Sequence, residues 1–109
     1  MNQRAAGPGL EIPRDKIADF CRRWKITELA LFGSALRDDF GPNSDVDMLV
    51  TFAPSAEWSL LDHIQMEQEL ASLLGREVDL VNRRAIDRSE NWIRRKEIQR
   101  TAQVVYASR

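Results

Sequence analysis

Cysteine, histidine and net charge are all scarce in this chain of 109 residues. The single cysteine, Cys21, excludes an intrachain disulfide and favours a reducing compartment. The first residues, MNQRAAGPGL, hold no apolar segment of signal-peptide length. No run approaches the ~18 apolar residues that a membrane span needs. These absences predict a cytoplasmic protein that does not cross a membrane.

An excess of basic residues is also missing, with 16 Lys plus Arg against 17 Asp plus Glu. Proteins that bind nucleic acid usually carry such an excess, because phosphate contacts dominate their affinity. The composition therefore argues against DNA or RNA as a direct substrate. The length fits one small domain. We expect a flexible leader over residues 1–11 and a single domain over residues 12–109, without room for a separate substrate-binding domain.

Amphipathic segments alternate with short apolar ones along residues 12–109. Apolar residues at three- and four-residue steps predict helices after Pro13, over 60–74 through a stripe of Leu60, Ile64, Ala71 and Leu74, and over 86–100. The helix over 86–100 is expected to pack through Ile86, Trp92, Ile93 and Ile98. Strands are expected at 27–32, 44–52 and 77–81, and a last strand or an extended tail at 102–107. This alternation predicts an α/β or α+β fold with one small sheet.

Two aspartates in the second expected strand are the main anomaly. Asp45 and Asp47 lie two residues apart, so both side chains leave the same face of a strand, roughly 7 Å apart. Like charges on one face repel each other unless a cation lies between them. Oxygen ligands at this spacing suit Mg²⁺ or Mn²⁺. The alternative is a solvated strand edge.

Asp79 is the second anomaly, because it lies inside the apolar strand EVDLV. A carboxylate in a strand interior is costly unless it is paired or binds a metal ion. If this strand lies beside the strand of Asp45, three carboxylates converge, as in a two-metal site for displacement at phosphorus. The alternative is a structural ion pair with Arg76, Arg83 or Arg84.

Gly33 and Ser34 follow the first expected strand and precede a short helical segment around residues 35–37. Backbone N–H groups at such a turn attract phosphate, and the hydroxyl of Ser34 adds a donor. Arg37, one turn later, could reach the same triphosphate. An ordinary turn and a solvated arginine are the alternatives.

Together these residues resemble a known signature. GSALRDDFGPNSDVDMLV is similar to the pattern of polymerase-β-type nucleotidyltransferases: Gly-Ser, a spacer of about ten residues, and Asp-x-Asp in a strand. Asp79 matches the third carboxylate of that pattern. The resemblance spans roughly residues 27–82 and implies an α+β core, a small mixed β-sheet flanked by helices.

The short length makes the chain similar to the minimal nucleotidyltransferase (MNT) branch, a catalytic core without an acceptor domain. The resemblance implies an antitoxin that transfers AMP from ATP to a tyrosine of a HEPN-domain toxin. It implies two Mg²⁺ ions, or Mn²⁺, held by Asp45, Asp47 and Asp79, and a triphosphate held by Gly33, Ser34 and Arg37. The chain itself has no Arg-x4-His motif, so the HEPN ribonuclease signature is absent.

Two other functions stay open from the sequence. The chain could neutralise a toxin by masking it, with an idle active site, but that role gives no reason for three converging carboxylates. It could instead modify a small molecule, if a homo- or hetero-oligomer completes the acceptor site. If the chain transfers a nucleotide, the recipient must come from outside this chain.

Overall fold

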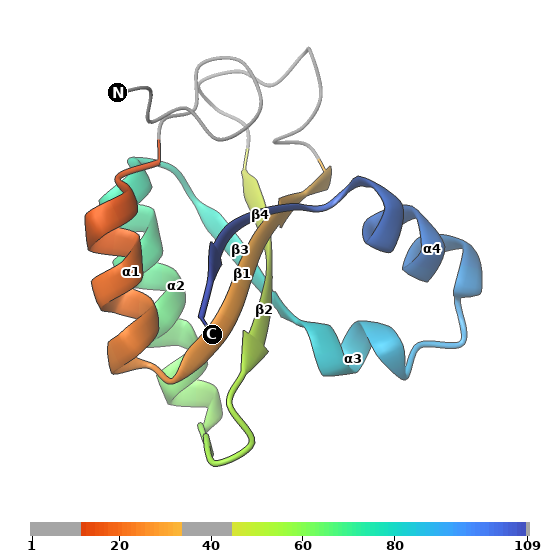
Figure 1. The fold of residues 1–109 in the computed structure, drawn as a ribbon, viewed down its shortest axis with the longest axis horizontal. Helices are drawn as coiled ribbons and strands as arrows, with labels where there is room; N and C mark the ends of the chain where they lie inside the picture. The colour runs from red at the N-terminus through yellow and green to blue at the C-terminus, as the bar shows by residue number, and fades with distance from the viewer. Residues whose placement is uncertain (1–11, 34–44, 109) are drawn as a thin grey trace.

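A four-stranded sheet in the order β3-β2-β1-β4 organises the chain (Figure 1). The computed structural model describes residues 12–33 and 45–108. The leader over 1–11 and the helical segment around 35–37 lie outside these described residues. The elements are α1 (Arg14–Arg23), β1 (Ile26–Phe32), β2 (Val46–Phe52), α2 (Leu60–Leu74), β3 (Val78–Asn82), α3 (Arg83–Asp87), α4 (Trp92–Thr101) and β4 (Gln103–Ala107).

The sheet is mixed. Strand β1 pairs antiparallel with both β2 and β4, whereas β2 and β3 run parallel. A parallel pair needs a crossover connection, and α2 supplies it between β2 and β3. The predicted α+β class, a small mixed sheet flanked by helices, is confirmed.

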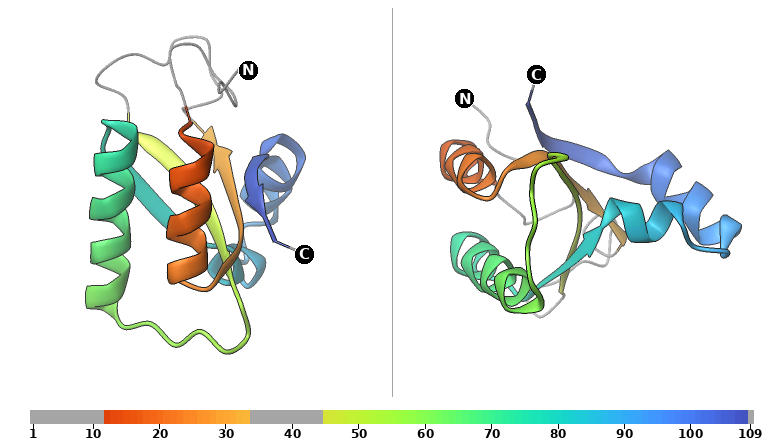
Figure 2. Two further views of the ribbon diagram at one scale, coloured as in Figure 1. Left: turned by 60° about the vertical axis from the view of Figure 1, so that its left-hand side comes forward. Right: turned by 90° about the horizontal axis from the view of Figure 1, so that it is seen from below.

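Helices cover both faces of the sheet. Figure 2 shows α1 and α2 side by side on one face, with α3 and α4 on the other. Alternate residues of β1 divide between these faces: Leu29 and Leu31 belong to the larger core, under α1 and α2, and Ala30 and Phe32 to the smaller one, with Ile86 and Ile98. No helix of the described residues is both long and apolar enough to cross a membrane.

Helix α2 confirms the predicted bounds but not the predicted stripe. Ser59 and Asp62 form a capping box at its start, and Gly75 ends it in the left-handed conformation. Its buried residues are Met66 and Leu70. Leu60 is 74% exposed and Ile64 41% exposed, so the expected stripe is wrong at these two residues, whereas Ala71 and Leu74 pack against the larger core as expected. The buried face of α2 is rotated by about one residue from the predicted face, so that Met66 lies in the core.

The single helix expected over 86–100 is also wrong, because two helices occupy this segment. Asn82 caps α3, where its Oδ1 accepts from Arg84 N at 2.9 Å. Asn91 caps α4 in the same way, accepting from Arg94 N at 3.1 Å. Side-chain caps of this kind favour a new helix start over continuation. Ile86 and Ile98 pack as expected, whereas Trp92 and Ile93 are exposed.

Trp58 lies within the fold rather than on a free surface. Its Nε1 donates to the backbone oxygen of Trp24 at 3.0 Å, and the two rings meet edge to face with centroids 5.1 Å apart. Trp24 in turn donates to Glu69 on α2. The aromatic pair therefore ties the loop before α2 to the end of α1.

The outer edge of β3 is covered by two side chains of α2. Leu80 N donates to Glu67 Oε2 at 2.8 Å, and His63 Nε2 lies 2.8 Å from the carbonyl oxygen of Leu80. Since a carbonyl only accepts, His63 Nε2 must carry a proton. Together these contacts satisfy the N–H and C=O of Leu80, which an edge strand would otherwise present to a foreign strand.

We expect Glu67→Ala to lower the free energy of unfolding by about 1–3 kcal/mol, because Leu80 N–H loses its acceptor. Glu67→Gln keeps an acceptor oxygen and should recover most of that loss. Urea unfolding of both variants tests this. Equal loss in the two variants would mean that the carboxylate charge matters and the hydrogen bond does not.

Cys21 is fully buried on α1. Burial raises the pKa of its thiol to about 12, against a smaller lowering by Arg22. The thiol of an unfolded chain ionises at about pH 8.5, whereas the folded thiol keeps its proton to a higher pH. The thiol therefore contributes to a fall in the free energy of unfolding as the pH rises from about 9 towards 12.

We expect iodoacetamide at pH 8 to alkylate Cys21 only after denaturant is added, as measured by intact mass. Rapid alkylation of the folded protein would contradict the burial of Cys21.

Candidate active site

Those predicted site residues that the structure describes lie at one end of the sheet. Here β1 ends, and β2 and β3 begin. Phe32, the last residue of β1, is the cross-strand partner of Asp47, and Asp47 is the partner of Asp79 in the parallel pair. Three strands that are distant in sequence thus bring the Gly33 turn and both carboxylates to one edge.

Asp47 and Asp79 point to the same side of the sheet because they are in register on neighbouring parallel strands. Such strands lie about 4.8 Å apart, so the two like charges are close neighbours. Asp45 lies directly before β2 and two residues from Asp47. Their neighbours Val46 and Met48 are fully buried in the larger core, under α1 and α2. The carboxylates therefore belong to the face that carries α3 and α4.

Gly33 is in contact with Asp47. It has a φ of +69°, in the left-handed region that favours glycine. A Cβ placed on Gly33 would lie 2.5 Å from Asp47 Oδ2, closer than such atoms approach. The turn therefore requires glycine for its conformation and for the space it leaves to the carboxylate.

Two predicted phosphate-binding residues, Ser34 and Arg37, lie outside the described residues. Their roles stay predictions that rest on the sequence.

One of the arginines that could form a structural ion pair with Asp79 pairs with another residue. Arg83 Nη1 lies 3.6 Å from Glu28 Oε2 on β1 instead. No ion pair joins Asp79 to Arg83 or Arg84 within the part of the chain that the structure describes. Asp79 is exposed, which leaves its carboxylate open to a ligand at this edge.

The donor set suits Mg²⁺, which prefers carboxylate and phosphate oxygens. Within residues 12–33 and 45–108, no three His, Cys, Asp or Glu side chains are already grouped to hold a metal ion. Magnesium is commonly held by one or two carboxylates together with substrate phosphates and water. The pair of Asp47 and Asp79, with Asp45 beside it, fits that mode of binding.

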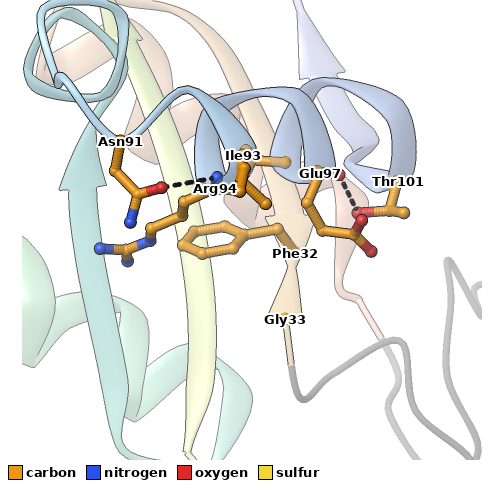
Figure 3. Close-up of a pocket in the computed structure, with 8 residues that line it drawn as sticks. Phe32, Gly33, Asn91, Ile93, Arg94, Glu97 and Thr101 are labelled. Carbon is orange, nitrogen blue, oxygen red and sulfur yellow. Dashed lines mark hydrogen bonds between the residues drawn. The ribbon is translucent and has the colours of Figure 1, made fainter.

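Sequence reasoning missed a cavity next to this edge. We call it the α4 cavity. It encloses about 530 Å³ between the end of β1, at Phe32 and Gly33, and one side of α4 (Figure 3). From α4, Ile93, Arg94, Glu97 and Ile98 line it. Nothing in the charged sequence of α4 predicts a cavity, because it depends on how α4 packs against β1.

Comparison with known proteins places these residues in a family. The model of the family described as "Nucleotidyltransferase domain" matches residues 14–105. Protein adenylyltransferase MntA of Thermococcus cleftensis is 44% identical over 59 residues, which cover 54% of this chain and 58% of that protein. A Methanocaldococcus jannaschii protein named "Putative protein adenylyltransferase" is 36% identical over 64 residues, 59% of this chain and 63% of that one. The chain thus spans less than two thirds of these two relatives.

Solved structures share the fold. One named "Structure of putative minimal nucleotidyltransferase" superposes with a TM-score of 0.62 at 31% identity, covering 82% of this chain and 85% of that one. A toxin–antitoxin crystal structure with AMP-PNP gives a TM-score of 0.67 at 24% identity, covering 90% and 76%. A complex of tri-AMPylated Shewanella oneidensis HEPN toxin with MNT antitoxin gives 0.58 at 24% identity, covering 87% and 70%.

Proposed function

The chain belongs to the nucleotidyltransferase domain family, and we propose that it transfers AMP from ATP to a tyrosine of a HEPN-domain toxin, acting as the antitoxin. The observation that carries the proposal is the register of the parallel strands, which sets Asp79 directly beside Asp47 while Gly33 contacts Asp47. Two carboxylates side by side, next to a glycine turn, suit phosphoryl chemistry that uses a metal ion.

The chain's own residues would act mainly by position and charge. The Gly33 turn, with Ser34 and Arg37, would hold the β- and γ-phosphates of ATP. The acceptor hydroxyl oxygen would attack the α-phosphorus in line. The bond from that phosphorus to the bridging oxygen would break, and pyrophosphate would leave. Asp79 would accept the proton of the hydroxyl, since it lies at the exposed side of the carboxylate pair.

Asp45, Asp47 and Asp79 would hold two Mg²⁺ ions, or Mn²⁺, together with the phosphates. When bound, the ions would neutralise the charge of the triphosphate and favour loss of a proton from the acceptor. Carboxylate oxygens are the ligands that such hard ions prefer.

The partner is proposed from the relatives. Two of them are named as protein adenylyltransferases, and a protein of the same fold is bound to an AMPylated HEPN toxin. The match covers only part of those relatives, so acceptor and partner need a direct test.

The test uses the full chain, a purified HEPN-domain toxin, Mg²⁺ and each nucleoside triphosphate in turn. We expect the intact mass of the toxin to rise by whole AMP units with ATP, and its ribonuclease activity to fall with that rise. If the toxin is inhibited without any gain in mass, masking replaces catalysis as the function. If a small alcohol acceptor is modified while the toxin is not, the proposed acceptor is wrong.

A further inference from the structure

We propose that the α4 cavity binds the nucleobase of the donor nucleotide, and that Arg94 is the residue that holds the base there. This inference rests on the proposed function and adds a second half to the nucleotide site. The first observation is its place: Gly33 lines the cavity and also contacts Asp47. A nucleotide whose phosphates lie at Gly33 and the carboxylates would therefore have its sugar and base within reach of the cavity.

The size and lining of the cavity fit a base. About 530 Å³ lies within the roughly 300–1,000 Å³ range of small-molecule sites. Phe32, Ile93 and Ile98 give it apolar walls, and Arg94 and Glu97 supply one positive and one negative group. Figure 3 shows the Phe32 ring lying between the side chains of Arg94 and Glu97. Apolar and aromatic walls with a few polar groups are typical of small-molecule sites, and they suit an aromatic base.

Arg94 is well placed for this role because, among the described residues, no acidic side chain pairs with it. Its backbone N–H donates to Asn91, but no carboxylate lies within ion-pair distance of its guanidinium in the described part of the chain. Glu97, by contrast, pairs with Arg100 at 2.8 Å. A guanidinium can stack on a base or donate to its ring nitrogens. The nearby Lys96 is also exposed but does not line the cavity.

The acceptor tyrosine is the competing occupant, and binding measurements without any acceptor separate the two. Affinity for ATP with Mg²⁺, and for inorganic tripolyphosphate with Mg²⁺, is measured by calorimetry on the full chain. We expect Arg94→Ala to weaken ATP about tenfold and Ile93→Ala to weaken it a few-fold, with tripolyphosphate unchanged. Lys96→Ala and Trp92→Ala are the matched controls on α4 and should bind both ligands as the unmodified protein does.

Four outcomes would overturn the inference. Unchanged ATP affinity in Arg94→Ala, with a raised KM for the acceptor, assigns the cavity to the acceptor. Weaker tripolyphosphate binding in Arg94→Ala assigns the arginine to the phosphates. If the unmodified protein binds neither ligand, the proposed function fails as well, whereas normal binding and transfer in every variant refute only the base site.

Discussion

Asp47→Asn is expected to lower nucleotidyl transfer about a thousandfold or more. The amide keeps the shape of the side chain but removes the charge at the centre of the site, where Asp47 lies between Gly33 and Asp79. Loss of several kcal/mol of charge stabilisation in the transition state corresponds to a factor of this size. The measurement is the rate at which the intact mass of the toxin rises with ATP and Mg²⁺.

The control is Asp87→Asn, which removes a carboxylate from the exposed end of α3 and should leave transfer unchanged. Thermal unfolding shows whether Asp47→Asn is folded, so that a lost activity is not a lost fold. Transfer at an undiminished rate in folded Asp47→Asn would reject the assignment of Asp47 to the metal site, although the family would stand.

Local sequence signals were sufficient for the parts of the site that depend on neighbouring residues. The two-residue spacing of Asp45 and Asp47 predicts that both side chains leave one face of a strand, and in the structure β2 begins at Val46, between them. Gly33 follows a buried apolar strand, as the sequence predicts, and the structure adds that its φ is positive. These features need only backbone geometry, and therefore sequence reasoning could reach them.

Features set by packing were beyond that reasoning. The pairing of Asp47 with Asp79 depends on a parallel register that only α2 and the core fix. The stripe through Leu60 and Ile64 failed because two helical faces of α2 are apolar, and only the sheet decides which one is buried. The α4 cavity arises where Asn91 restarts the helix, a break that the charge pattern does not reveal.

Gly33→Ala is expected to reduce transfer about a hundredfold at a modest cost in stability. The substitution forces alanine to adopt φ +69°, which costs about 1–2 kcal/mol. The added methyl group would also lie 2.5 Å from Asp47 Oδ2. That atom is the end of a flexible side chain, so the carboxylate can rotate away and the fold survives. Asp47 then leaves the position from which it would act, and a displacement of about 1 Å can cost this much rate.

Gly75→Ala is the matched control, because Gly75 has the same φ of +69° but no atom within 4 Å of its added Cβ. Both variants should lose similar free energy of unfolding in urea, while only Gly33→Ala loses transfer. Equal activity in the two variants would mean that Asp47 need not keep its contact with the turn. Equal loss of activity would point to backbone strain as the cause. A selective loss in Gly33→Ala identifies the space beside the carboxylate as the property that this glycine provides.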